Sequence, residues 1–169
     1  MHLKKSKPTP QSLWKAASGC DEEAIAQIAR DLAQETQAGD RFFLEGTLGS
    51  GKSTFAQALI AALGVSEPPA GSPTFALAHE YTSKVCDIIH LDFYRLKSQD
   101  EIEEAGIDSY FWERKAIVIS EWISLWPEYE SQVARTSPCV WRVRLELETT
   151  PTTRSIEITR SEMTHLKGY

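Results

Sequence analysis

Apolar residues recur at two different spacings along the chain, and each spacing predicts a different kind of element. In residues 21–37 the apolar positions follow the helical period and fall on one face: Ile25, Ile28, Ala29, Leu32 and Ala33. Residues 52–63 are rich in alanine and leucine and predict a second helix, with Gly64 placed to end it. A short acidic helix is expected over residues 99–105, ending at Gly106.

Two nearly continuous apolar runs predict buried strands. Residues 41–45 read Arg-Phe-Phe-Leu-Glu and residues 116–120 read Ala-Ile-Val-Ile-Ser, as expected at the centre of a sheet. Residues 74–81 and 85–91 predict two more strands, joined as a hairpin at residues 82–84.

Near the end of the chain, apolar and charged residues alternate strictly in place of continuous apolar runs. Val143, Leu145 and Leu147 alternate with charged residues, and residues 154–160 repeat the pattern. This alternation predicts half-exposed antiparallel strands at a margin of the sheet. The fold class that the whole pattern predicts is α/β: one domain, with a mixed sheet, helices on both faces and antiparallel edge strands.

Length and charge narrow the kind of protein that this domain forms. A chain of 169 residues suffices for one α/β domain with a full core, which is predicted over residues 13–169. Residues 1–12 are polar and basic with two prolines, and they predict a flexible tail rather than a secretory signal. The net charge of −6 argues against a protein that grips nucleic acid by itself, since phosphate contacts need a basic surface.

Cysteine usage and hydropathy favour a cytoplasmic location. Cys20, Cys86 and Cys139 are odd in number and far apart, which indicates neither a disulfide framework nor a zinc site. No apolar run in the sequence is long enough to span a bilayer. We therefore expect a protein of a reducing compartment with no membrane partner.

A phosphate-binding sequence lies between the first predicted strand and the second predicted helix. Residues 46–53 read Gly-Thr-Leu-Gly-Ser-Gly-Lys-Ser, which matches G-x-x-x-x-G-K-[S/T]. Glycines let backbone N–H groups wrap a polyphosphate closely, and the following helix aims its positive end at the same anion. The expected nucleotide-binding residues are Thr47, Leu48, Gly49, Ser50, Gly51, Lys52, Ser53 and Thr54.

Lys52 and Ser53 carry the most specific expectations of this loop. The ammonium of Lys52 is expected on the β- and γ-phosphates, and the hydroxyl of Ser53 on Mg²⁺. The chain contains no asparagine, so a guanine-reading N-K-x-D element is excluded in its usual form. The prediction is a P-loop NTPase domain with ATP and Mg²⁺ as cofactors.

Two carboxylates at predicted strand ends are candidates for Mg²⁺ and for the attacking water. Glu121 directly follows the apolar strand 116–120, and Asp92 follows residues 88–91. Either carboxylate alone would be typical of a solvated strand end. Beside a P-loop, both are expected to bind Mg²⁺ together with Ser53 or to orient the water.

Three further residues have a functional and a plain structural interpretation. Thr74 follows a proline-rich loop and is placed either to sense the γ-phosphate, as a switch residue does, or to begin a strand. His90 lies inside an apolar strand, which is more typical of a satisfied core residue. Trp122 directly follows Glu121 and is compatible with a simple core position.

Together these motifs resemble the bacterial TsaE family, also called YjeE, the ATPases of tRNA threonylcarbamoyladenosine biosynthesis. The similarity runs from about residue 21 to residue 122, in the family's order and spacing. Five blocks carry it: residues 46–55, Ser-Pro-Thr-Phe at 72–75, His-Leu-Asp-Phe-Tyr-Arg at 90–95, residues 101–111 around Gly106, and Glu-Trp at 121–122. The blocks after the P-loop are far more specific than the P-loop alone.

The resemblance implies a P-loop fold that binds ATP between the glycine loop and residues 72–75. It also implies six functional positions: Lys52, Ser53, Thr74, Asp92, Glu121 and Trp122. Members of the family hydrolyse ATP weakly alone and act with a TsaB–TsaD heterodimer, which modifies adenosine 37 of tRNAs that read A-starting codons. The implied role of the ATPase is to reset that complex, so tRNA is an indirect partner, in agreement with the acidic charge.

Two other classes of function stay open at this point. A small P-loop kinase of a metabolite needs an acceptor pocket and usually an arginine-bearing lid, whereas the arginines after the P-loop are scattered. A nucleotide-gated binding module would use ATP occupancy to close a switch, with hydrolysis as an incidental event.

Overall fold

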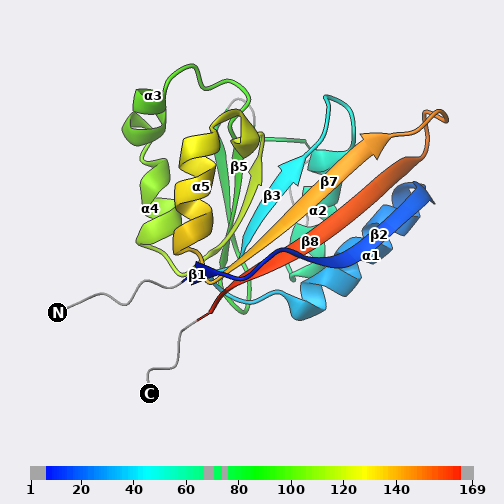
Figure 1. Cartoon of the computed structure of the whole chain (residues 1–169), viewed down its shortest axis with the longest axis horizontal. Helices are drawn as coiled ribbons and strands as arrows, with labels where there is room; N and C mark the ends of the chain where they lie inside the picture. Colours follow the sequence, from blue (N-terminus) through cyan, green and yellow to red (C-terminus); the bar gives the residue numbers. More distant parts are fainter. Residues whose placement is uncertain (1–6, 67–70, 74–75, 165–169) are drawn as a thin grey trace.

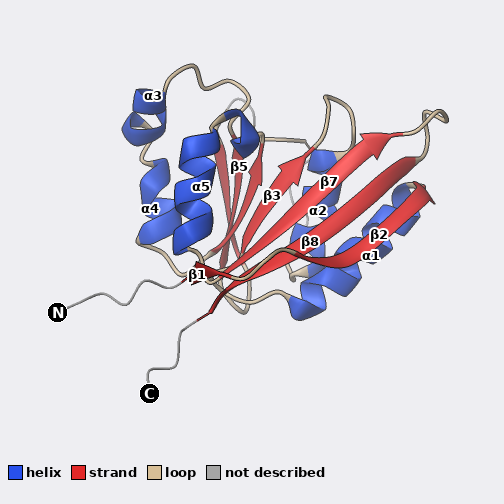
Figure 2. Ribbon diagram, viewed as in Figure 1, coloured by secondary structure: helices blue, strands red, loops and turns tan. Residues whose placement is uncertain are grey.

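A mixed β-sheet runs through the molecule and carries helices on both of its faces (Figures 1 and 2). The computed structural model describes residues 7–66, 71–73 and 76–164, and within these ranges eight strands form the sheet. The strands are β1 (Lys7–Pro8), β2 (Ser12–Cys20), β3 (Arg41–Glu45), β4 (Ala78–Thr82), β5 (Asp87–Asp92), β6 (Ile117–Glu121), β7 (Cys139–Leu147) and β8 (Arg154–Thr164). Their order is β1-β8-β7-β3-β6-β5-β4, and β2 also pairs with β8.

The helices divide between the two faces of the sheet. They are α1 (Glu22–Glu35), α2 (Lys52–Ala62), α3 (Gln99–Glu104), α4 (Ile107–Trp112), the 3₁₀ helix η1 (Ile123–Leu125) and α5 (Pro127–Thr136). One buried cluster joins α1 and α2 to the sheet, and a second cluster joins α3, α4 and α5 to its other face. None of the helices in the described ranges is both long and apolar enough to cross a membrane.

Strand parity places three polar side chains on the face that carries α2. Ile88 of β5 and Ile119 of β6 belong to the cluster that contains α1 and α2. Because successive side chains of a strand point to opposite faces, residues at the same parity share this face. His90 and Asp92 of β5 and Glu121 of β6 therefore point toward α2, from the ends of two parallel strands.

The parallel core of the sheet confirms the predicted strands and helices. Strand β3 spans the predicted residues 41–45, and α1 and α2 lie within the predicted segments. β6 runs one residue past the predicted end, so Glu121 is its last residue. The predicted fold class, a mixed sheet with helices on both faces and antiparallel strands at its edges, is confirmed.

Two strand predictions require correction. The strand expected over residues 74–81 begins only at Ala78, since Leu77 has a left-handed backbone (φ 61°) that interrupts extended structure. Residues 74–75 lie outside the described ranges. β7 was expected at an antiparallel margin, but it pairs in parallel with β3 and antiparallel with β8, inside the sheet. Its alternating pattern arises because α1 and α2 cover only one of its faces.

More of the amino-terminal segment belongs to the sheet than the sequence predicts. Residues 1–12 are predicted as a tail, yet Lys7 and Pro8 pair with β8, and the Thr9 amide donates to the Glu162 carbonyl at 2.8 Å. β2, which no pattern in the sequence predicted, pairs along β8 from Ser12 to Cys20. Both strands satisfy backbone groups of β8 that would otherwise form an open edge.

Arg41, the first residue of β3, is a buried cation held by carbonyl groups. Its side chain is 3% exposed; Nη1 donates to the Ala116 carbonyl at 2.6 Å and Nη2 to the Phe111 carbonyl at 2.8 Å. Burial lowers the pKa of Arg41 to about 10, which still leaves it charged at neutral pH. The side chain therefore joins the end of α4 to the start of β6.

We expect Arg41→Ala to lower the free energy of unfolding by about 3 kcal/mol or more, because it leaves a cavity and two carbonyls without their donor. Urea denaturation followed by far-UV circular dichroism measures this loss. Arg144→Ala, at a side chain that is 56% exposed, is the control and should change stability by at most about 0.5 kcal/mol. Equal effects of the two substitutions would contradict a structural role for the buried guanidinium.

Candidate nucleotide site

The glycine-rich loop after β3 is packed closely against the end of β7 and the start of β8, at the same end of the sheet. Gly46 has φ 143°, and a Cβ atom there would collide with the Leu145 carbonyl and the Ser50 side chain. Gly51 is the N-cap of α2 with φ 101°, and a Cβ there would lie 2.9 Å from Arg154 Nε. At Gly46 both the space and the backbone angle exclude a side chain, whereas at Gly51 the backbone angle is what favours glycine.

The ammonium of Lys52 is held over the mouth of this loop. It donates to the carbonyls of Gly46 at 2.8 Å and Thr47 at 2.9 Å, and it lies 3.8 Å from the centre of the Trp122 ring. The side chain is 4% exposed, and burial lowers the pKa of Lys52, an effect that the nearby carboxylates of β5 and β6 partly offset. A positive charge is thus fixed at the start of α2.

A chain of hydrogen bonds joins the phosphate loop to the centre of the sheet. Ser53 Oγ donates to Glu121 Oε2 at 3.0 Å, and Glu121 Oε1 contacts His90 Nε2 at 2.8 Å. Glu121 is 2% exposed and His90 is fully buried. Two of the three residues predicted as Mg²⁺ ligands, Ser53 and Glu121, are therefore in direct contact, and both oxygens of the carboxylate have a partner.

Asp92 binds the loop that precedes β4. Its Oδ1 accepts from the Tyr94 amide at 2.9 Å, and the Ser72 hydroxyl donates to its Oδ2. Asp92 is opposite Glu121 in the register of β5 and β6, so the two carboxylates lie at the same end of adjacent strands. Thr74, the predicted switch residue, lies outside the described residues, and Ser72 is the described residue of its block that reaches the site.

Trp122 has a strained backbone at the end of β6. Its φ of 63° is in the left-handed region, which costs a non-glycine residue roughly 1–2 kcal/mol. Its ring lies 4.9 Å from that of Tyr94 and against the Lys52 ammonium. The half-buried indole therefore forms a wall of the site, whereas the sequence alone was equally compatible with a core position. Strain of this kind concentrates at functional sites.

These elements enclose a cleft of about 410 Å³. The residues that line it are Leu48, Gly49, Gly51, Lys52, Ser53, Thr54, Ser72, Asp92, Tyr94, Arg95, Glu121, Trp122 and Arg154. Of the predicted loop residues, Thr47 and Ser50 do not line the cleft: Thr47 supplies a carbonyl to Lys52, and Ser50 is fully buried behind the loop.

A second cleft of about 390 Å³ adjoins the first at the start of α2. The two share Gly51, Thr54 and Arg154, and Ile25 of α1 contributes an apolar wall. Arg154 comes from the first position of β8, and its Nε donates to the Ser50 carbonyl at 3.0 Å. The sequence analysis missed this residue, since the pattern of β8 gave it only an edge-strand role.

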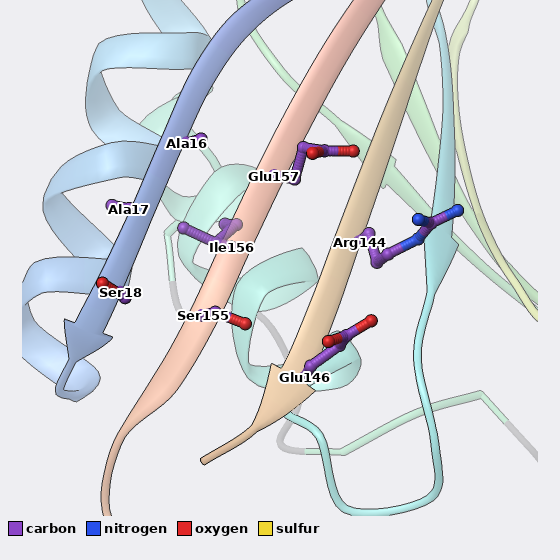
Figure 3. Close-up of a pocket in the computed structure, with 8 residues that line it drawn as sticks. All are labelled: Ala16, Ala17, Ser18, Arg144, Glu146, Ser155, Ile156 and Glu157. Atoms are coloured by element: carbon purple, nitrogen blue, oxygen red, sulfur yellow. The ribbon is translucent and has the colours of Figure 1, made fainter.

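A hollow of about 510 Å³ on the sheet lies apart from the phosphate loop. Figure 3 shows Ser155 and Glu157 of β8 beside Arg144 and Glu146 of β7, with β2 forming the third side. None of the predicted site residues lines it. It is an open, charged face of the sheet, separate from the cleft beside the phosphate loop.

The oxygen donors at the strand ends suit Mg²⁺ bound with a nucleotide. In the described part of the chain, no group of three or more His, Cys, Asp or Glu side chains is arranged to hold a metal by itself. Mg²⁺ typically keeps several waters and takes one or two protein oxygens together with substrate phosphates. Ser53 and Glu121, already in contact at 3.0 Å, match that donor set.

Comparison with known proteins gives one family. A family model described as "Threonylcarbamoyl adenosine biosynthesis protein TsaE" matches residues 20–156. The tRNA threonylcarbamoyladenosine biosynthesis protein TsaE of Bacillus subtilis is 35% identical over 115 residues, which cover 68% of this chain and 68% of that relative. Its namesake from Aquifex aeolicus is 40% identical over 97 residues, 56% of this chain and 73% of the relative.

A solved structure shows the same fold. The crystal structure of Bacillus subtilis YdiB aligns with 97% of this chain and 90% of its own, with a TM-score of 0.64 and 23% sequence identity. The aligned part includes β7 and β8, which lie beyond residue 122, where the similarity of the quoted sequence motifs ends.

Proposed function

Because this chain belongs to the TsaE family, we propose that it is the ATPase subunit that supports threonylcarbamoyladenosine modification of adenosine 37 in tRNAs reading A-starting codons. One observation carries the proposal. The carboxylate of Glu121 is buried at the end of β6 and bonded to Ser53, the P-loop hydroxyl, at 3.0 Å. This pairing supplies the oxygen ligands that a nucleotide-bound Mg²⁺ needs, beside the fixed ammonium of Lys52.

The proposed nucleotide is ATP, with its phosphates in the cleft between the P-loop and Trp122. Lys52 would move its hydrogen bonds from the Gly46 and Thr47 carbonyls to the β- and γ-phosphates. The second cleft, which begins at Gly51 and Thr54, is where we place the nucleoside. Its Ile25 wall offers an apolar surface for a base.

Glu121 and Asp92 are the proposed acidic groups of the reaction. Mg²⁺ supplies charge neutralisation on the phosphates, and Ser53 with the two carboxylates would hold it directly or through water. Glu121 would then orient the attacking water, because hydrogen bonds to Ser53 and His90 hold its carboxylate in place. Lys52 stabilises charge on the transferring phosphoryl group.

Thr74 remains a proposed switch residue. Its block begins with Ser72, whose hydroxyl bonds Asp92 at the edge of the cleft. A γ-phosphate in the cleft would thus lie near the start of the loop that carries Thr74. Ordering of such a segment by the γ-phosphate is a known mode of nucleotide switching.

The proposed partners are a TsaB–TsaD-type heterodimer and, through it, tRNA. The net charge of −6 disfavours direct phosphate contacts, so a partner must carry the tRNA. In this proposal ATP hydrolysis resets the complex between turnovers and makes no carbamoyl bond itself.

Phosphate release from ATP–Mg²⁺ tests the proposal, measured with the chain alone and with the heterodimer and tRNA. We expect slow release alone and faster release in the full mixture. A metabolite kinase would instead transfer the phosphoryl group to its acceptor and release little phosphate to water, whether or not that acceptor is present. If ATP–Mg²⁺ neither binds nor reacts in any of these mixtures, the proposed function is wrong.

A further inference from the structure

His90 is buried in the sheet and yet bonded to the carboxylate at the centre of the site. Its ring is 0% exposed, and its Nε2 lies 2.8 Å from Glu121 Oε1. We propose that His90 is a positioning residue, which fixes the orientation of Glu121 for catalysis. This inference rests on the proposed function, because it assigns the role of one residue in the same site.

The hydrogen-bond pattern assigns the tautomer of the ring. An ionised carboxylate only accepts hydrogen bonds, so the shared proton belongs to His90 Nε2. Nδ1 is buried and has no hydrogen-bond partner within the described residues. The geometry therefore directs an Nε2–H group of the ring at Glu121.

A structural role alone does not account for histidine at this position. Buried polar atoms are normally satisfied, and an unpaired one destabilises the fold relative to an apolar side chain. The residues beside His90 in the strand, Ile89 and Leu91, are apolar and fully buried. Histidine therefore carries a cost in stability at this position, and its one side-chain hydrogen-bond partner among the described residues is the carboxylate of Glu121.

The sheet makes this contact rigid. His90 is paired with Ile119 in the register of β5 and β6, and Asp92 with Glu121, so ring and carboxylate project from neighbouring positions of adjacent strands. His90 binds Oε1, which leaves Oε2 to face Ser53 and the cleft. Without the ring, the flexible glutamate side chain would lose the bond that holds its carboxylate in the orientation that directs one oxygen at the cleft.

Two substitutions test the role in hydrolysis. His90→Leu removes the donor and should lower kcat by about 10- to 100-fold, as is typical for partners that orient metal-site ligands, while Kd for ATP changes much less. His90→Gln places an amide N–H near the original Nε2 and should restore most of the activity. His79→Gln, at the histidine opposite His90 in β4, is the matched control and should leave kcat unchanged.

Magnetic resonance of the ¹⁵N-labelled imidazole gives a readout that is independent of activity. We expect the Nε2–H tautomer for His90, with a proton resonance that shifts upfield in Glu121→Ala. This measurement also decides the question if His90→Leu fails to fold.

An Nδ1–H tautomer, or a kcat of His90→Leu equal to that of the unsubstituted protein, would overturn the inference. Either result leaves the proposed function standing, provided that the unsubstituted protein hydrolyses ATP. Failure of that protein to bind ATP would instead remove the proposed function itself.

Discussion

Lys52→Ala is expected to lower the affinity for ATP–Mg²⁺ by about two to three orders of magnitude and to abolish hydrolysis. Lys52 as a whole is 4% exposed and lines the cleft, so its interaction with a phosphate there is less screened than at the open surface. Truncating one member of a buried, hydrogen-bonded charge pair typically costs about 2–5 kcal/mol, or about 1.5 to 3.5 orders of magnitude in affinity, and the expected loss lies within this range. Isothermal titration with a non-hydrolysable ATP analogue measures the loss.

The control for this substitution is Lys97→Ala. It removes the same charge from an exposed position outside both clefts, and it should leave affinity and turnover unchanged. Thermal unfolding of both variants shows whether loss of the Gly46 and Thr47 hydrogen bonds has loosened the loop. Unchanged affinity and turnover in a folded Lys52→Ala protein would refute the phosphate-binding role.

Glu121→Gln is expected to reduce hydrolysis by about 10²- to 10⁴-fold while ATP still binds. The amide keeps the size of the side chain and an oxygen that can accept from His90. It removes the negative charge that the proposed roles of Glu121, binding Mg²⁺ and orienting the water, require. Phosphate release under single-turnover conditions, together with an ATP titration, separates the loss of chemistry from the loss of binding.

Glu128→Gln is the matched control, at an exposed position in the first turn of α5. It should behave as the unsubstituted protein does in both assays. The same Glu121→Gln protein also discriminates between an ATPase and a nucleotide-gated module. If it binds ATP and the heterodimer and still supports many rounds of tRNA modification, hydrolysis is incidental and the gated module is the better description.

The phosphate loop could be predicted from the sequence because every part of it is local. A strand, a glycine loop and a helix follow one another within residues 41–62. The glycines are needed for close approach of the backbone to phosphate, and the lysine is needed for its charge. The carboxylates Asp92 and Glu121 were predictable as strand-end residues for the same reason. The sequence did not show that His90 would bond Glu121 or that Arg154 would bond the phosphate loop.

The partners come from parts of the chain that only the sheet brings together. His90 and Glu121 are 31 residues apart, and Arg154 and Ser50 are 104 apart. The period-two spacing of His90 and Asp92 was a usable signal, since it puts both side chains on one face of β5. β2 had no comparable signal, because exposed residues and small residues such as Ala16 interrupt its pattern.

Arg154 gives the turn between β7 and β8 a connection to nucleotide binding. Its guanidinium bonds the peptide carbonyl of Ser50 and also lines both clefts. A protein that displaced this turn would shift a backbone group of the phosphate loop. Thermodynamic linkage then makes the effect mutual: the factor by which such a protein changed the affinity for ATP is the factor by which ATP would change the affinity for it.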